Sequence, residues 1–141
     1  MVALVDTNIF LDVLLERKGL VEDSSRVIDE FARFPGSGWI SWHTLSNLYY
    51  VGERSVGRSA AIQHIDAILS VFEVCPVDSQ AARLARTLPL DDFEDALQVA
   101  SAIQAHVRII VTRNVVDFMK SPVPALLPAD FIRQIAHPRG S

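Results

Sequence analysis

Acidic and amide side chains stand at three places in this chain where their oxygens could bind a divalent cation. Asp6 ends an apolar run at residues 2–5, and Asn114 follows another apolar run at residues 108–112. Carboxylate oxygens are ligands that Mg²⁺ and Mn²⁺ prefer, and a bound ion can activate water for hydrolysis. The candidate residues are Asp6 with Asn8, Asp92 with Asp95, and Thr112 and Asn114 with Asp117.

Strand and helix patterns alternate along the chain and place these residues at one edge of a sheet. Strands are expected at 2–5, 38–41, 72–77 and 108–112, with a last short one in the proline-punctuated segment after Pro122. Helices are expected at 8–15, 23–34, from 43, at 58–69, 79–88 and 92–105, with a final helical turn. This alternation predicts an α/β fold, a single-domain α/β/α sandwich with a central parallel sheet of four or five strands. The carboxyl ends of parallel strands meet at one edge, where open α/β sheets bind ligands.

The helix expected at 92–105 begins with a cluster of acids. At about 100° per residue, Asp92 and Asp95 lie side by side on one flank of its apolar stripe, and Glu94 lies on the opposite flank. Like charges this close destabilise a helix unless a cation or the helix N-terminus offsets them. The helix dipole alone explains Asp91 and Glu94 better than it explains Asp95. The stripe consists of Phe93, Ala96, Leu97, Ala100 and Ile103.

Composition limits the class of protein. A chain of 141 residues that is 50% hydrophobic is long enough for one domain, with a short flexible tail expected near residues 136–141. No apolar stretch approaches the roughly 20 residues that span a bilayer, and no basic leader is visible, so we expect a cytoplasmic protein. The single cysteine excludes a cysteine metal cage, and the net charge of −4 argues against nucleic-acid binding through a broad basic surface.

The three motifs together resemble the PIN-domain family. They are a hydrophobic run ending in DTN at Asp6, a DxxDA helix start at Asp92, and VTRNxxDF from residue 111. The likeness covers nearly the whole chain and is to small bacterial PIN proteins of the VapC toxin type. It implies a PIN-like domain over 1–141 that is a Mg²⁺- or Mn²⁺-dependent endoribonuclease, the toxin of a type II toxin–antitoxin pair. Implied partners are an RNA substrate, a cognate antitoxin and a second copy of the chain, with no membrane.

The resemblance and the chemistry of the residues assign roles to the candidate groups. Asp6 and Asp95 are the expected primary metal ligands, and Asp92 or Asp117 completes the site or orients a ligating water. The expected reaction is in-line attack of a metal-activated water on an RNA phosphodiester, without a side-chain nucleophile. The expected catalytic set is Asp6, Asp92, Asp95, Asn114 and Asp117; water-positioning roles are expected for Asn8, Asn47, Thr112 and Asn114, and a phosphate contact for Arg113.

Two amides stand where the family usually has acids, and they keep other interpretations open. Most such proteins carry a glutamate on the helix after the second strand, where this chain has Asn47, and the late position often held by Asp is Asn114. A PIN-like module could therefore bind RNA or a protein without cleaving. An unrelated phosphotransferase or phosphatase could use Asp6 as its nucleophile, although no second Asp follows two residues later. His43 suits a cap or packing role better than catalysis.

Overall fold

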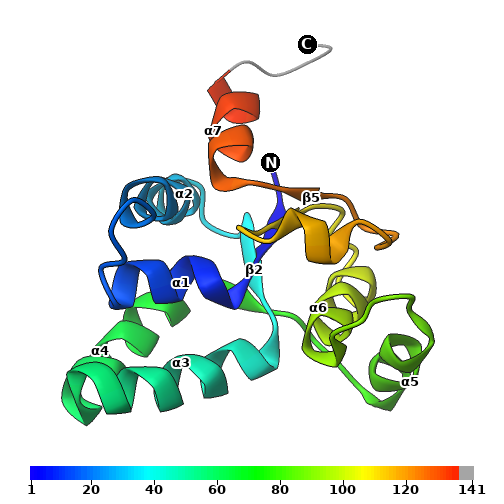
Figure 1. Cartoon of the computed structure of the whole chain (residues 1–141), viewed down its shortest axis with the longest axis horizontal. Helices are drawn as coiled ribbons and strands as arrows, with labels where there is room; N and C mark the ends of the chain where they lie inside the picture. The colour runs from blue at the N-terminus through cyan, green and yellow to red at the C-terminus, as the bar shows by residue number, and fades with distance from the viewer. Residues whose placement is uncertain (137–141) are drawn as a thin grey trace.

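A computed structural model describes residues 1–136 and shows a parallel sheet covered by helices on both faces (Figure 1). The five strands lie in the order β3–β2–β1–β4–β5, and every neighbouring pair is parallel. The strands are β1 (Ala3–Val5), β2 (Gly38–Ile40), β3 (Glu73–Val74), β4 (Ile110–Val111) and β5 (Ala125–Leu126). The helices are α1 (Thr7–Leu14), α2 (Val21–Arg33), α3 (Trp42–Val56), α4 (Arg58–Leu69), α5 (Ser79–Thr87), α6 (Phe93–Gln104), the 3-10 helix η1 (Val115–Phe118) and α7 (Pro128–Ala136).

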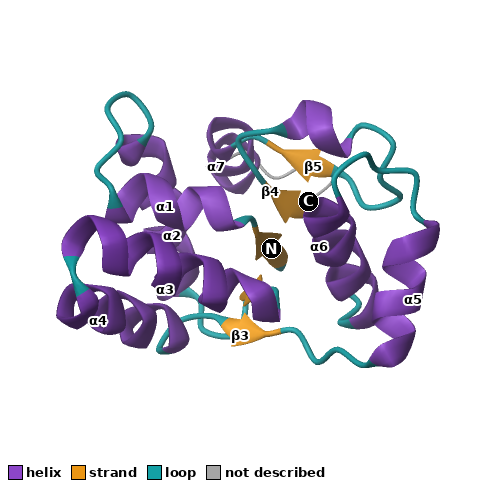
Figure 2. Cartoon of the chain, turned by 60° about the horizontal axis from the view of Figure 1, so that its bottom comes forward, coloured by secondary structure: helices purple, strands orange, loops and turns teal. Residues whose placement is uncertain are grey.

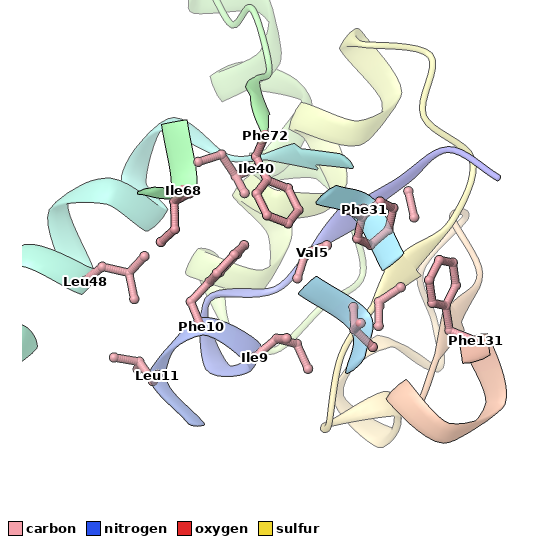
Figure 3. Packing of buried hydrophobic residues seen from close by; sticks show 13 residues of the cluster. Val5, Ile9, Phe10, Leu11, Phe31, Ile40, Leu48, Ile68, Phe72 and Phe131 are labelled. Atoms are coloured by element: carbon pink, nitrogen blue, oxygen red, sulfur yellow. The ribbon is translucent and has the colours of Figure 1, made fainter. Parts of the chain in front are cut away.

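Alternation along β1 divides the hydrophobic core between the two faces of the sheet. Val5 packs in a cluster with Phe10 and Phe31, which also includes side chains of α3, α4 and α7 (Figure 3). Leu4 packs on the other face with Val99 of α6. Burying each large side chain contributes roughly 1.5–3 kcal/mol to the stability of the fold. The two clusters therefore stabilise the sheet from both of its faces. The predicted α/β/α sandwich with a central parallel sheet is confirmed.

The reversal of strand order beside β1 determines where a ligand can bind. The chain places β2 on one side of β1 and β4 on the other, so a crevice opens at the carboxyl ends of β1 and β4. Val5 pairs with Val111 across these strands. The next residues, Asp6 and Thr112, therefore meet directly at this edge. The predicted convergence of the two polar strand ends is confirmed.

Several elements differ in extent from the sequence prediction. The strand expected at 72–77 is limited to Glu73–Val74, and Pro76 has no N–H with which to extend a ladder. The final helical turn is a nine-residue helix, α7. Of the tail expected near 136–141, residues 137–141 lie outside the described part of the chain. Within residues 1–136, no helix is both long and apolar enough to cross a membrane.

The orientation of α6 is the main correction to the predicted fold. Phe93 is 51% exposed, whereas Val99 and Ala102 are fully buried. Of the predicted stripe, Ala96 and Ala100 are buried as expected, but Phe93 is not, and burial extends to the neighbouring face that carries Val99 and Ala102. A further surface of α6, which carries Glu94, Asp95 and Gln98, lines the cavity at the carboxyl edge of the sheet.

Candidate functional site

Asp6 is the buried centre of the site. Its side chain is only 3% exposed although it carries a carboxylate. Its Oδ2 accepts a 2.7 Å hydrogen bond from Thr112 Oγ1, and its Oδ1 accepts one from Gln98 Nε2. Asp6 is also the N-cap residue of α1, yet its side chain makes no cap hydrogen bond. Both oxygens are thus held by neutral donors, which orient the carboxylate without neutralising it.

A cavity of about 350 Å³ opens beside Asp6 and has a lining rich in oxygen atoms. Among the described residues, neither lysine nor arginine contributes to this lining. Such a surface attracts cations and repels the phosphates of a nucleic acid unless a cation is bound. The lining residues are Asp6, Thr7, Asn8, Leu11, Asn47, Tyr50, Val51, Asp92, Glu94, Asp95, Gln98, Asn114 and Asp117.

Asp92 and Asp95 are coupled at the start of α6. Asp92 is the N-cap residue rather than part of the helix, and its Oδ1 accepts a 3.0 Å hydrogen bond from the backbone N–H of Asp95. The Asp95 side chain then projects into the cavity from the first turn. Burial, followed by the negative charges of Asp92, Asp6, Asp117 and Glu94 in that order, raises the pKa of Asp95 from 3.8 to about 7. A bound cation would offset this crowding of negative charges.

The segment after β4 brings the third predicted group to the same cavity. Thr112 Oγ1 accepts a 3.0 Å hydrogen bond from the backbone N–H of Asn114 while donating to Asp6. Asn114 precedes the 3-10 helix η1, in which Asp117 is exposed. The structure thus brings the three predicted polar groups, with Asn8 and Asn47, around one cavity.

Glu94 contradicts the sequence prediction, which placed it on the flank opposite Asp95. It lines the cavity, and its Oε1 accepts a hydrogen bond from Asn47 Nδ2 of α3. His43 Nε2 lies 3.8 Å from the same oxygen. Burial lowers the pKa of His43, and the charges of Glu94 and Asp6 oppose that shift. Glu94 therefore belongs electrostatically to the site.

Gln98 is a site residue that sequence reasoning missed. It is 1% exposed, and its Oε1 has no hydrogen-bond partner in the described part of the chain. The sequence signal that could have identified Gln98 is its position, since it is a polar residue one turn beyond Asp95 on a buried helix face. An unsatisfied buried oxygen is costly, so a water or ion in the cavity would stabilise it.

The donor set fits a hard divalent cation that keeps part of its water shell. All candidate ligands present oxygen, as Mg²⁺ and Mn²⁺ prefer. Within residues 1–136, no three acidic, histidine or cysteine side chains converge closely enough to form a ready-made metal cage. A cation held here would therefore use few direct protein ligands, which is the usual behaviour of Mg²⁺.

Comparisons with known proteins agree with this geometry. A family model described as the PIN domain matches residues 2–116. The chain belongs to the PIN-domain family. No curated protein matches the sequence.

Solved structures similar to this PIN domain include components of toxin–antitoxin complexes. VapBC2 from Rickettsia felis, bound to a promoter DNA fragment, gives a TM-score of 0.70 at 18% identity, covering 90% of this chain and 98% of that one. A toxin–antitoxin complex from Klebsiella pneumoniae gives a TM-score of 0.66 at 25% identity, covering 89% of this chain and 97% of that one. VapC20 from Mycobacterium tuberculosis is described as a toxin that cleaves the sarcin–ricin loop. It gives a TM-score of 0.61 at 19% identity, covering 77% of this chain and 86% of that one. These likenesses support the fold of the PIN domain.

Arg113 does not line the cavity of this PIN domain. Its Nε donates a 2.7 Å hydrogen bond to Asp12 Oδ2, and the Asp12 side chain is fully buried. Ser24 Oγ donates to the same oxygen at 2.9 Å, and Arg17 approaches Oδ1 at 3.3 Å. Arg113 thus ties the end of β4 to α1 and α2, and the phosphate contact expected for it stays a prediction.

Proposed function

We propose that this PIN domain is a divalent-cation-dependent endoribonuclease that hydrolyses RNA phosphodiester bonds. The observation that carries the proposal is the buried Asp6 carboxylate, fixed by Gln98 and Thr112 at the edge of a cavity lined by further acids. A cation site of this chemistry suits phosphoryl transfer, because a cation offsets charge on both the substrate and the leaving oxygen.

Asp6 and Asp95 are the residues that would hold the cation, with Asp92 or Asp117 completing the site. When bound, a Mg²⁺ or Mn²⁺ ion supplies Lewis acidity and lowers the pKa of an attached water. Gln98 and Thr112 keep the Asp6 carboxylate in one orientation, so little reorganisation is needed as charge develops. Asn114 and Asn8 line the cavity and can hydrogen-bond a water or a phosphate oxygen. The reaction is attack of water in line with the departing ribose oxygen.

The biological role we propose is the toxin of a type II toxin–antitoxin pair in the cytoplasm. Support comes from membership of the PIN-domain family and from the toxin–antitoxin complexes among the similar structures. The expected partners are an RNA substrate and a cognate antitoxin. A homodimer remains a prediction from the sequence.

RNA cleavage with and without cations tests the enzymatic proposal. Purified protein is incubated with single-stranded and structured RNA in Mn²⁺, Mg²⁺ or EDTA, as wild type, Asp6→Asn and Asp29→Asn. Asp29 is an exposed acid on α2 and serves as the charge-matched control. We expect cleavage in Mn²⁺ or Mg²⁺ by the wild type and the control only. Cleavage that persists in EDTA would contradict the cation requirement.

A second function, binding of RNA without cleavage, is favoured by the two amides Asn47 and Asn114 and by the lack of a ready-made cage among residues 1–136. The same experiment separates the two. Retention of RNA in a gel-shift assay, without product at any Mn²⁺ concentration, would identify a binding module.

A further inference from the structure

Glu94 supplies a carboxylate on the side of the cavity where α3 presents the neutral amide of Asn47. We propose that Glu94 acts as an additional acid of the cation site and that Asn47 is the positioning residue that holds it there. This inference rests on the cation site of the proposed function. It extends that site to a residue whose sequence position suggests only a favourable contact with the helix dipole.

The contact between Asn47 and Glu94 spans the cavity from one helix to another. Asn47 is on α3 and Glu94 is in the first turn of α6, and the two helices lie on opposite sides of the strands (Figure 2). Asn47 Nδ2 donates to Glu94 Oε1, and both residues line the cavity beside Asp6. A carboxylate serving only the dipole needs no partner on another helix, and Asp92 already caps α6.

The two oxygens of Glu94 have different surroundings. Oε1 accepts the hydrogen bond from Asn47 and lies 3.8 Å from His43 Nε2. Oε2 makes no hydrogen bond to any other residue in the range 1–136. A carboxylate has about four acceptor positions, so one oxygen can be fixed while the other stays free for a cation or one of its waters.

The neighbouring Gln98 gives an independent indication that this face of the cavity binds a ligand. Gln98 follows Glu94 by four residues and Asp95 by three, so the three side chains share one face of α6. Gln98 lines the cavity and is 1% exposed, yet its Oε1 is unsatisfied among the described residues. A hydrated cation held near Glu94 and Asp95 would bring water donors to this face.

Mn²⁺ binding, measured by isothermal titration calorimetry, tests the role of the Glu94 charge. Glu94→Gln keeps an acceptor for Asn47 and removes only the charge. Glu53→Gln makes the same change at an exposed position of α3 that does not line the cavity. We expect Glu94→Gln to weaken Mn²⁺ binding by about 10- to 100-fold, and Glu53→Gln to bind like the wild type. Equal affinities for wild type and Glu94→Gln would overturn the proposal.

Two further variants test the role of Asn47. Asn47→Ala leaves Glu94 without its anchor and should weaken Mn²⁺ binding by about tenfold. The double substitution N47E/E94Q returns a carboxylate to the cavity, now on α3 with an amide opposite. It should regain most of the affinity lost in Glu94→Gln. Full affinity in Asn47→Ala, or no recovery in a double variant with wild-type thermal stability, would show that Asn47 does not position the acid.

The outcome separates this inference from the proposed function, since calorimetry needs no RNA. Weaker Mn²⁺ binding in Glu94→Gln, with a wild type that never cleaves RNA, supports the role of Glu94 and contradicts the nuclease. Cation-dependent cleavage by the wild type, with unchanged Mn²⁺ binding and cleavage in Glu94→Gln, supports the nuclease and overturns the inference. A wild type that binds no Mn²⁺ overturns the inference as well.

Discussion

Thr112 donates a 2.7 Å hydrogen bond to Asp6 although the two residues are 106 positions apart in the chain. The pairing of Val5 with Val111 in adjacent parallel strands places both residues at the same edge. The hydroxyl also accepts from the backbone of Asn114. One side chain therefore fixes both the central carboxylate and the segment that carries Asp117.

Removal of the Thr112 hydroxyl should lower the stability of the protein. Thr112→Val keeps the shape of the side chain but leaves Asp6 Oδ2 without its donor in a buried site. We expect the free energy of unfolding to fall by about 1–3 kcal/mol in urea denaturation. Thr112→Ser, which keeps the hydroxyl, should stay closer to the wild type. Equal destabilisation by the two variants would mean that packing, rather than the hydrogen bond, matters here.

The stability of the metal-free protein should decrease as the pH rises. Burial and the neighbouring acids raise the pKa of Asp95 from 3.8 to about 7, so the folded state binds this proton more tightly than the unfolded chain. The resulting stabilisation is complete below the unfolded pKa and is lost as the pH rises through about 7. Urea unfolding between pH 4 and 8 measures the slope.

Asp95→Asn provides the control for this pH dependence, because it cannot ionise. We expect a shallower decrease of stability with pH in this variant. Addition of Mn²⁺ at pH 8 should stabilise the wild type more than Asp95→Asn. A wild-type slope that Asp95→Asn leaves unchanged would place the titrating group elsewhere.

Arg113 offers a test between a structural and a substrate-binding role. Arg113→Met leaves the fully buried Asp12 with Arg17 as its remaining ion-pair partner among residues 1–136. We expect a loss of stability of about 3 kcal/mol in urea denaturation, because an undercompensated buried charge is expensive. The double substitution D12N/R113M removes the buried charge and should recover part of the lost stability. Unchanged stability with weaker RNA binding would instead support the phosphate contact predicted from sequence.

The parallel sheet and the position of Asp6 at a strand end could be predicted because both depend on local patterns. A short apolar run that ends in an acid indicates a strand end, and parallel pairing then brings such ends together. The places of Asp6 and Thr112 followed from this rule. Their roles in binding a cation remain predictions.

The contacts of Glu94 and Arg113 could not be predicted because tertiary packing decides them, and the sequence signal for Gln98 was a weak one. The sequence of α6 has apolar residues on more than one side, and packing buries Val99 together with Ala96 and Ala100 while Phe93 stays exposed. The partner of Arg113 is Asp12, 101 residues away, and no local pattern indicates that pair. Strand lengths were overestimated for a related reason, since apolar residues continue beyond the last paired residue.

The cleavage rate of Asp6→Asn at saturating Mn²⁺ tests the central claim most directly. Asparagine keeps the size of the side chain and removes the charge that would hold the cation. We expect the single-turnover rate on RNA to fall by about a thousandfold, equivalent to about 4 kcal/mol of transition-state stabilisation, with wild-type thermal stability or higher. A folded Asp6→Asn that cleaves RNA at the wild-type rate would contradict a cation-dependent nuclease centred on Asp6.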